Sequence, residues 1–496
     1  MNYRSTRNSA CQVTAAEAIT RGISAEGGLF VPESLPRISP EELASLAGQS
    51  YQQKAEFVLS RFLTDFTPEE LRACVNGAYT TEKFDSEEIS QLAKVGDQTY
   101  FLELWHGPTC AFKDMALQLL PYLLTTSARK TAPDEEIVVL VATSGDTGKA
   151  ALEGFKDVPG TRMLVFYPEN GVSAMQKLQM TTQQGENVAV CAIQGNFDDA
   201  QSGVKKIFTD PQVLEELARR HQRFSSANSI NWGRLVPQIV YYVAAYTSLM
   251  EQGEIQPGEE VNVVVPTGNF GNILAAYYAK HMGVPFGKLI CASNRNNVLT
   301  DFLDTGIYDR NREFYATTSP SMDILISSNL ERLLYELCGR DDAVIREWFG
   351  QLAEEGVYEV SEEVKEKLAD EFWGGFCDDE GAASAIAETF GEYGYLCDPH
   401  TAVAVQVYED YLEATEDPRK TIIASTASPY KFNDTVLAAI TDEPVPEDPF
   451  AQAEMLARLS GLTPPDSLMA LKDRPVRFTG STAPAGMVDQ VKAMLG

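Results

Sequence analysis

Histidine is scarce in this sequence of 496 residues, and its cysteines do not lie in closely spaced pairs. It holds four histidines and eight cysteines, and none of them forms an HxH, HExxH or CxxC pattern or a cluster at zinc spacing. The sequence therefore predicts no metal site and no metal catalysis. Reduced, mostly buried thiols are expected at Cys11, Cys74, Cys110, Cys191, Cys291, Cys338, Cys377 and Cys397.

Basic residues are also few. Forty Lys and Arg against 71 Asp and Glu leave a formal net charge of −31. Such a charge repels phosphate backbones and anionic lipid, so nucleic acid and membrane surfaces are not expected as partners. An anionic small-molecule substrate would need a local cationic pocket that overcomes this field.

Long apolar runs and targeting segments are missing as well. The N-terminus, MNYRSTRNSACQV, has no basic region followed by an apolar one, so no secretory signal is predicted. The most apolar helical stretch, Leu235 to Met250, contains Pro237 and is shorter than the ~20 residues that a membrane span needs. A buried helix and a cytoplasmic protein are expected.

Short apolar strands alternate with helical patterns from about residue 98 onward. Each strand is followed by a turn containing Gly, Ser or Asn, and uniformly apolar strands of this kind are typical of parallel sheet covered by helices on both faces. The pattern predicts an α/β fold, preceded by a mainly helical layer up to about residue 85. The expected strands are Ile137 to Val141, Arg162 to Phe166, Val188 to Ile193, Val261 to Val265, Lys288 to Ala292 and Lys420 to Ala424.

Two strand-to-helix turns favour anions. In Val265 to Ala276 (VPTGNFGNILAA), the glycines let backbone N–H groups converge at a helix N-terminus, which suits a phosphate. In Ala142 to Ala151 (ATSGDTGKAA), hydroxyls lie beside free amides, while Asp146 suits a helix cap better than an anion. An ordinary structural turn is the alternative for each. Neither segment matches a dinucleotide fingerprint or a P-loop.

Lys113 is expected at the start of a helix. It lies in Glu103 to Gln118 (ELWHGPTCAFKDMALQ), where the positive end of the helix dipole and shielding by Phe112 both disfavour the ammonium form. The neutral amine would then be available for a Schiff base. An ordinary surface lysine is the alternative. A fourth polar turn, Ala424 to Phe432 (ASTASPYKF), carries hydroxyls and Lys431 at another strand end.

Nine segments in this order resemble the threonine synthase family, in the branch with its own N-terminal domain. The resemblance runs over nearly the whole chain. Its motifs are YRSTR, AEGGLFVPESLP, ELWHGPTCAFKD, ATSGDTGKAA, NSINWGRLVPQ, VPTGNFGNILA, SPSMDILISSNLERLL, DPHTAVA and STASPYKF.

The resemblance implies a pyridoxal-phosphate enzyme with a tryptophan synthase β-like fold, in which two lobes of mostly parallel sheet hold the cofactor between them. The implied reaction converts O-phospho-L-homoserine and water to L-threonine and phosphate. We expect an N-terminal domain over 1–85, a first lobe over 86–260, a second lobe over 261–440 and a helical C-terminal extension over 441–496. The protein is expected to be a monomer or homodimer.

The family motifs also imply roles for individual residues. Lys113 matches the Schiff-base lysine and catalytic base, and Thr426 matches the hydroxyl residue at the pyridine nitrogen. Gly268, Asn269, Phe270 and Gly271 match the cofactor phosphate loop. Thr143, Ser144, Asp146 and Thr147 match the loop that binds the substrate carboxylate, and the candidate cations for the substrate phosphate are Lys149, Arg234 and Lys431.

Two features depart from the family pattern, and two alternatives stay open. Lys149 stands where a small residue is commoner, and Cys110 where an aliphatic residue is commoner. Another pyridoxal-phosphate lyase of the same fold, such as a serine/threonine dehydratase or a phospho-lyase, would share many of these motifs. A non-catalytic relative is the second alternative. In every case the acidity is expected on outer faces such as Glu354 to Glu380.

Overall fold

The computed structural model describes residues 1–143, 145–170 and 172–495. Its N-terminal part combines a small antiparallel sheet, in the order β2-β1-β3, with four helices that each begin at a capping box. In each box a Ser or Thr side chain accepts from the backbone N–H of a Glu or Gln three residues later. The side chain of that Glu or Gln in turn accepts from the backbone N–H of the Ser or Thr. The elements are β1 (Tyr3–Ser5), β2 (Asn8–Val13), α1 (Ala15–Arg21), β3 (Phe30–Pro32), α2 (Pro40–Ser45), α3 (Tyr51–Phe62) and α4 (Pro68–Ala78).

A five-stranded parallel sheet forms one lobe, in the order β16-β8-β7-β6-β9. Four helices connect its strands in sequence. The elements are β6 (Glu136–Ala142), α7 (Asp146–Phe155), β7 (Thr161–Pro168), α8 (Ala174–Thr181), β8 (Val188–Ile193), α9 (Phe197–Thr209), α10 (Pro211–Arg219), β9 (Gln222–Ser225) and β16 (Ser481–Thr482).

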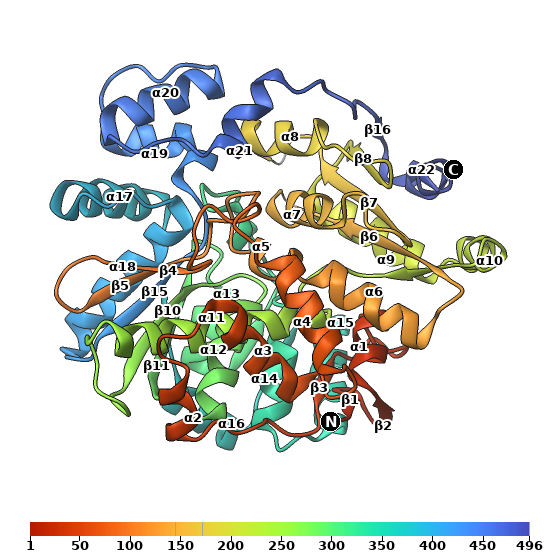
Figure 1. The fold of residues 1–496 in the computed structure, drawn as a ribbon, viewed down its shortest axis with the longest axis horizontal. Coiled ribbons are helices and arrows are strands. Elements are labelled where there is room, and N and C mark those ends of the chain that lie inside the picture. Colours follow the sequence, from red (N-terminus) through yellow and green to blue (C-terminus); the bar gives the residue numbers. More distant parts are fainter. Residues whose placement is uncertain (144, 171, 496) are drawn as a thin grey trace.

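A six-stranded sheet forms the other lobe, in the order β14-β11-β10-β15-β5-β4, parallel except for the β4–β5 pair. Its strands are β4 (Gln91–Lys94), β5 (Thr99–Glu103), β10 (Val261–Pro266), β11 (Phe286–Ser293), β14 (Phe372–Phe376) and β15 (Thr421–Ser425). Its larger helices are α11 (Trp232–Glu251), α12 (Gly271–Met282), α13 (Val298–Thr305), α14 (Leu330–Leu337), α15 (Asp342–Glu354), α16 (Glu362–Glu371), α17 (Asp379–Tyr393) and α18 (Pro399–Thr415). Figure 1 shows the two lobes one above the other.

The remaining elements join and cover the lobes. The short helix α5 (Asp114–Leu117) lies between the lobes in Figure 1, and α19 to α21 lie at the top. The elements are α5, α6 (Leu120–Thr131), the pair β12 (Ile307–Asp309) and β13 (Val357–Glu359), the 3-10 turns η1 (Pro320–Met322) and η2 (Pro429–Lys431), α19 (Asn433–Ile440), α20 (Pro449–Ser460), α21 (Asp466–Met469), the turns η3 (Ala470–Asp473) and η4 (Pro484–Gly486), and α22 (Met487–Met494).

The α/β fold of two mostly parallel lobes is confirmed, and all six expected strands are present. The strands of each sheet do not follow one another in chain order. Strands β4 and β5, within 86–260, pair in the sheet that holds β10 and β15, while β16 of the C-terminal segment joins β8. The N-terminal part also contains a sheet. These pairings join strands far apart in sequence, where no local pattern reveals them; the domain boundaries themselves stay a prediction.

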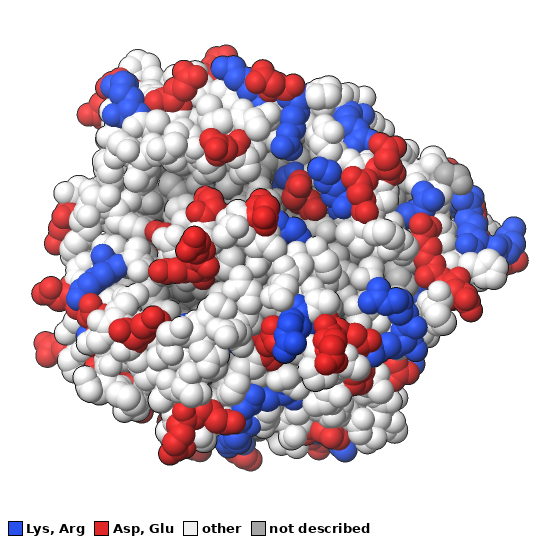
Figure 2. Space-filling model, in the orientation of Figure 1, with Lys and Arg blue, Asp and Glu red and all other residues white. Residues whose placement is uncertain are grey.

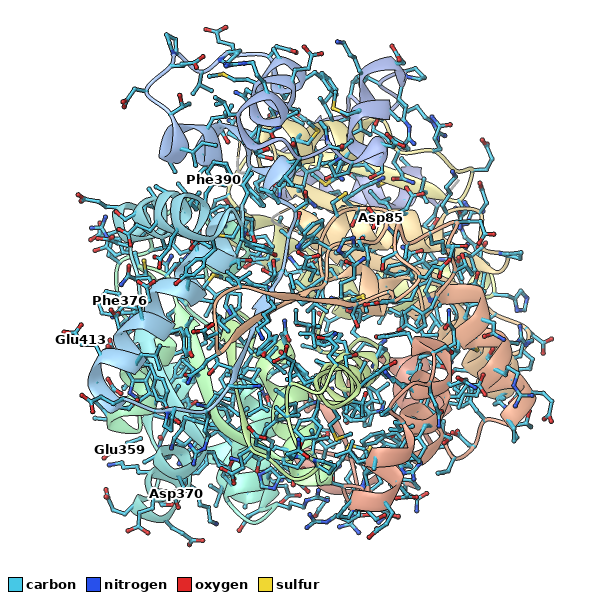
Figure 3. All side chains as sticks on the ribbon, turned by 60° about the vertical axis from the view of Figure 1, so that its left-hand side comes forward. Asp85, Glu359, Asp370, Phe376, Phe390 and Glu413 are labelled. Atoms are coloured by element: carbon cyan, nitrogen blue, oxygen red, sulfur yellow. The ribbon has the colours of Figure 1, made fainter. Side chains whose placement is uncertain are left out.

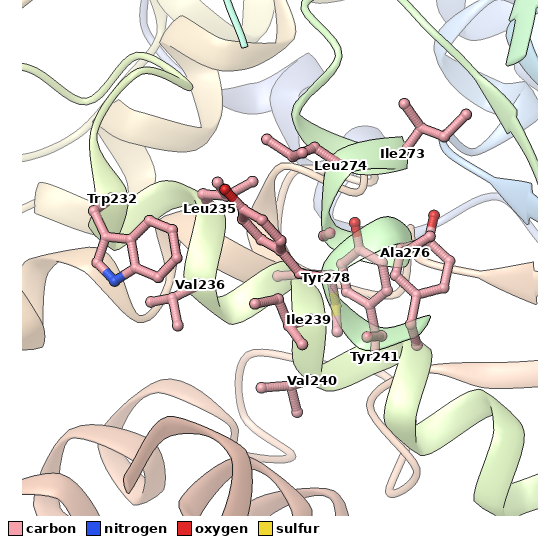
Figure 4. Close-up of a cluster of buried hydrophobic side chains, with 14 of the residues drawn as sticks. Trp232, Leu235, Val236, Ile239, Val240, Tyr241, Ile273, Leu274, Ala276 and Tyr278 are labelled. Atoms are coloured by element: carbon pink, nitrogen blue, oxygen red, sulfur yellow. The ribbon is translucent and has the colours of Figure 1, made fainter. Parts of the chain in front are cut away.

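Helix α11 forms the centre of the main core. The side chains of Trp232, Leu235, Val236, Ile239 and Tyr241 are fully buried, and Figure 4 shows residues of this helix gathered beside those of α12. The expected buried helix is therefore confirmed, and in the described ranges no helix is long and apolar enough to cross a membrane.

The excess negative charge lies on outer surfaces. Between Glu354 and Glu380 every acidic residue is exposed except Glu371, which is half-buried. Figure 3 shows Glu359, Asp370 and Glu413 at the edge of the molecule, and in Figure 2 acidic and basic side chains are interspersed over one whole face. The expected placement of the acidity is confirmed for this segment.

Candidate active site

Lys113 and Thr426 are brought together by backbone pairing. The Phe112 N–H donates to the Thr426 carbonyl over 2.8 Å, and Ala111 and Ala427 form an isolated antiparallel bridge. Thr426 follows directly on β15 and is buried. The residue expected at the pyridine nitrogen and the expected Schiff-base lysine therefore lie at the same strand end.

The Lys113 amine is set in a shielded position at the start of α5. Its Nζ donates to Ser321 Oγ over 3.1 Å. Burial, reinforced by the nearby charges of Lys431 and Arg234 and opposed by Asp146, lowers the pKa of Lys113 to about 8. The amine is thus far easier to deprotonate than an exposed lysine, as a nucleophile or base requires.

The turn Gly268–Gly271 opens helix α12. Phe270 is the residue before the helix and has the left-handed backbone angle φ 64°. The adjoining segment holds the turn from the side: Ser327 Oγ donates to the Gly268 carbonyl over 2.7 Å, and the Asn329 N–H donates to the Asn269 carbonyl over 3.0 Å. The turn therefore presents its amides at the positive end of a 12-residue helix.

Two unpartnered donors belong to residues next to this turn. The Nδ2 atoms of Asn272 and Asn329 are buried without a hydrogen-bond partner among the described residues. A Cβ added at Gly271 would lie 3.4 Å from Asn329 Nδ2, so glycine keeps the space in front of that donor free. Buried donors without acceptors indicate an anionic group with several oxygens, such as a phosphate.

Asp146 and Lys431 form a buried ion pair. Lys431 Nζ lies 2.6 Å from Asp146 Oδ1 and donates to the Thr109 carbonyl over 2.9 Å. Gln176 Nε2 donates to the same carboxylate oxygen over 3.0 Å. Burial alone would raise the pKa of Asp146, but Lys431, Lys113 and these hydrogen bonds hold it well below the ordinary value.

Arg234 is a buried cation without an acidic partner among the described residues. It lies in the first turn of α11, donates through Nη1 to the Ala227 carbonyl, and leaves Nε unpartnered. Burial lowers the pKa of its guanidinium to about 10. A desolvated guanidinium of this kind favours a bound anion.

The other expected substrate residues differ in their surroundings. Thr143 Oγ1 accepts from the N–H groups of Gly145 and Gly148 and so stabilises the start of α7. Thr147 is half-buried, and Ser144 lies outside the described residues. Lys149 is buried and pairs with Glu153 over 2.9 Å, and its Nζ also donates to Gln183. Its amine is thus already neutralised by a residue of its own helix.

Sequence reasoning missed several residues of the site. Ser321, Asn329 and Gln176 contact Lys113, the glycine turn and Asp146, and none was assigned a role. Ser321 and Asn329 do lie in the family-like motif SPSMDILISSNLERLL, which was the available signal. Their partners are distant in sequence: Ser321 and Lys113 are 208 residues apart.

The models of three protein families match successive parts of the chain. The model of the threonine synthase N terminus matches residues 2–79, that of the pyridoxal-phosphate dependent enzymes matches residues 76–360, and that of the threonine synthase C-terminal region matches residues 401–493. Threonine synthase from Pseudomonas aeruginosa is 38% identical over 437 residues, which cover 88% of this chain and 90% of that one. Threonine synthase-like 1 from Homo sapiens is 41% identical over 459 residues, covering 90% of this chain; the chain spans 61% of the length of that relative.

Solved structures agree with these matches. The crystal structure of threonine synthase from Brucella melitensis, described as bound to PLP, superposes with a TM-score of 0.87 at 35% identity and covers 100% of this chain and 99% of that one. Threonine synthase from yeast has a TM-score of 0.87 at 32% identity, with 100% and 98% covered. The lobes described above are thus the fold of these enzymes.

Proposed function

Because the chain belongs to the threonine synthase family of pyridoxal-phosphate-dependent enzymes, we propose that it converts O-phospho-L-homoserine and water to L-threonine and phosphate. The observation that carries the proposal is that a lysine of lowered pKa and a buried hydroxyl residue at the end of β15 lie at the same edge of the sheet as a glycine turn with unpartnered donors at the end of the parallel neighbour β10. A cytoplasmic location and a monomeric or homodimeric state are part of the proposal.

The residues present fit pyridoxal phosphate. Gly268, Asn269, Phe270 and Gly271 would hold its phosphate, Lys113 its aldehyde carbon, and Thr426 its ring nitrogen. When bound, the cofactor supplies an electron sink for negative charge that develops on the substrate carbons. A hydroxyl at the ring nitrogen, unlike a carboxylate, does not force that nitrogen to stay protonated, and this moderates the sink.

Lys113 has two tasks in this proposal. It binds the cofactor at rest, and as a free amine it moves protons at the substrate carbons. A pKa of about 8 places it close to neutral pH, where a group both accepts and returns a proton efficiently. Its position at the start of α5, next to the strand end that carries Thr426, keeps it within reach of the reacting atoms.

Two buried cations support binding of the substrate phosphate. Arg234 has no acidic partner among the described residues, and Lys431 shares Asp146 with Gln176 and Lys113. Both shift the pKa of Lys113, so they lie close enough to it to interact. We propose these two as the phosphate ligands. Lys149 stays the weaker candidate, because it pairs with Glu153 and, unlike Arg234 and Lys431, is not among the charges that shift the pKa of Lys113. The loop of Thr143, Ser144, Asp146 and Thr147 is proposed for the carboxylate end, with Asp146 pairing with Lys431 and not with the substrate carboxylate.

The test is a product assay on the purified protein loaded with pyridoxal phosphate. Incubation with O-phospho-L-homoserine should release threonine and phosphate in equal amounts. Lys113→Ala should lower the rate at least about 1,000-fold, and Lys177→Ala, an exposed lysine of α8, should leave it unchanged. Normal threonine formation by Lys113→Ala would overturn the proposal.

A phospho-lyase of the same fold is the second candidate. The identity to the relative named threonine synthase-like 1, 41%, is higher than the 38% to the threonine synthase of Pseudomonas aeruginosa. A lyase would release phosphate, ammonia and 2-oxobutyrate from the same substrate, with water consumed in the release of ammonia instead of being added to the carbon chain as a hydroxyl. The same assay, extended to 2-oxobutyrate, therefore separates the two candidates.

A further inference from the structure

His400 is a buried histidine that the proposed reaction does not use. It is the second residue of α18, and its side chain is 3% exposed. Its Nδ1 lies 2.6 Å from Asp398 Oδ1. Asp398 also accepts from the His400 N–H over 2.9 Å and from the Thr401 hydroxyl. The carboxylate is thus fixed at the helix start and orients the imidazole ring.

The other ring nitrogen contacts a backbone amide. His400 Nε2 lies 3.2 Å from the Ser321 nitrogen. A backbone N–H only donates, so Nε2 must accept, and the ring proton must be on Nδ1, where it is donated to Asp398. The geometry therefore assigns one neutral tautomer to His400 and leaves no freedom in the direction of the ring.

Ser321 connects this histidine to both halves of the proposed site. Its Oγ accepts from Lys113 Nζ over 3.1 Å. Its carbonyl oxygen would lie 2.7 Å from a Cβ added at Gly268, so it packs directly against the glycine turn. The turn η1, which contains Ser321, thus lies between the lysine and the expected phosphate loop.

The far side of η1 is held independently of His400. Asp323 Oδ1 accepts from Thr317 Oγ1 over 2.7 Å and from Asn294 Nδ2 over 2.8 Å, and its Oδ2 accepts from the Thr317 N–H over 3.0 Å. The segment is therefore anchored at one end by Asp323, while the His400 contact fixes the Ser321 amide itself.

We propose that Asp398 and His400 act as positioning residues, which fix the place of Ser321. The Ser321 hydroxyl then accepts from the Lys113 amine and orients it, and the Ser321 carbonyl packs against the glycine turn. In this proposal His400 acts through its contact with the Ser321 amide. The inference rests on the proposed function, since it concerns the lysine and the turn that serve it. A purely structural role, packing against the Phe432 ring at 5.0 Å, is the competing explanation.

A matched pair of variants separates the two roles. His400→Gln keeps an acceptor near the position of Nε2, whereas His400→Asn keeps a polar group near Asp398 but is too short to reach Ser321. Both remove the aromatic contact with Phe432. If packing alone mattered, the two variants would behave alike.

The first measurements use the protein without cofactor, so they do not depend on the substrate. Hydrogen exchange of the peptide containing Ser321 should be at least about 10-fold faster in His400→Asn and within about 3-fold of the parent in His400→Gln. The rate at which pyridoxal phosphate attaches to Lys113, trapped with borohydride and located by mass spectrometry, should follow the same order.

Activity of the loaded enzyme completes the test. His400→Asn should lower kcat about 10- to 100-fold with little change in KM, and Ser321→Ala should do the same. The double variant should be no worse than either single one, because the residues act as a unit. Equal behaviour of the Gln and Asn variants, or additive effects in the double variant, would overturn the inference. If the parent protein attaches the cofactor but forms no threonine, the proposed function fails while the exchange and attachment results still decide this inference.

Discussion

Lys431 Nζ lies 2.6 Å from Asp146 Oδ1, and the two residues follow strands of different sheets. Lys431 follows β15 of the six-stranded sheet, and Asp146 begins α7 after β6 of the five-stranded sheet. Their side chains are 0% and 3% exposed. The pair is therefore an ionic contact between the two lobes, and both of its charges lie close enough to Lys113 to shift the pKa of that amine.

Breaking this pair should destabilise the protein. Asp146→Asn or Lys431→Met leaves one buried charge without its partner, and each is expected to lower the free energy of unfolding by about 3 kcal/mol. The double variant should lose less than the sum of the two, because it leaves no isolated charge. Urea unfolding of the four proteins gives the cycle.

Lys365→Met is the matched control for this cycle. Lys365 pairs with Glu359, whose side chain is 58% exposed, and an exposed pair contributes little to stability. Strictly additive losses for Asp146→Asn and Lys431→Met would show that the two side chains do not stabilise each other.

The sequence predicts where the strands lie better than it predicts which strands pair with each other. Val188–Ile193 and its counterparts are continuous apolar runs, which is a local signal that needs no tertiary information. Strand β5 carries a similar signal, but its pairing with β15 joins Thr99 to Thr421. Such a register depends on the whole fold, so no local pattern shows which strands share a sheet, and the lobe boundaries stay a prediction.

The site was predictable where one segment carries the chemistry. Lys113 and the turn Gly268–Gly271 each combine a helix start with a telling side chain or glycine, and the family motifs assigned their roles. Ser321 and His400 lie in two of the family-like motifs, SPSMDILISSNLERLL and DPHTAVA, but these motifs assigned them no role. Their importance comes from contacts with each other and with Lys113, which only the folded chain brings together.

Attachment of the cofactor should depend on pH through Lys113. Burial, with Lys431 and Arg234 acting in the same direction, lowers the pKa of this amine to about 8. The rate of pyridoxal phosphate attachment to the cofactor-free protein should therefore rise with pH and reach half its maximum near pH 8, against about 10.4 for an exposed lysine. Borohydride trapping with mass spectrometry measures both classes of lysine in one sample.

The charges near Lys113 determine the direction in which the half-maximal pH of attachment moves. Arg234→Met removes a charge that lowers the pKa, so the half-maximal pH should move upward. The unfolded chain binds this proton more tightly than the folded one, so the contribution of Lys113 to stability should increase as the pH rises from about 8 to about 10.5. A midpoint that stays in place in Arg234→Met would show that the guanidinium does not act on the amine.

His106 should stabilise the protein only while it is protonated. Its Nδ1 lies 2.6 Å from Asp85 Oδ1 and its Nε2 lies 2.8 Å from Glu103 Oε2. Burial alone would lower the pKa of His106, but these two carboxylates raise it to about 9. Its folded pKa is above the unfolded value, so the stabilisation is complete below about pH 6.5 and is lost as the pH rises to about 9.

His106→Asn should therefore lower the free energy of unfolding by about 1 to 3 kcal/mol at pH 6 and by much less at pH 10. Urea unfolding at the two pH values measures the difference. His221→Asn is the control, because His221 is exposed and has a left-handed backbone angle, φ 54°, that asparagine tolerates. An equal loss at both pH values would assign His106 a packing role instead of a charge role.

Two glycine substitutions should act in opposite directions. A Cβ at Gly268 would lie 2.7 Å from the Ser321 carbonyl oxygen, a backbone atom that has to shift to make room. Gly268→Ala should therefore lower the free energy of unfolding by about 1 to 3 kcal/mol. Because the shift displaces the turn from Ser321, it should also weaken binding of pyridoxal phosphate at least about 10-fold.

Gly350 is the matched control, because it lies inside α15 with nothing within 4 Å of an added Cβ. Gly350→Ala should raise the free energy of unfolding by about 0.5 to 1 kcal/mol through helix propensity and leave binding unchanged. Fluorescence titration of the cofactor-free proteins and urea unfolding measure the two effects, and unaltered cofactor affinity in Gly268→Ala would mean that contact between the turn and Ser321 is not needed to form the phosphate site.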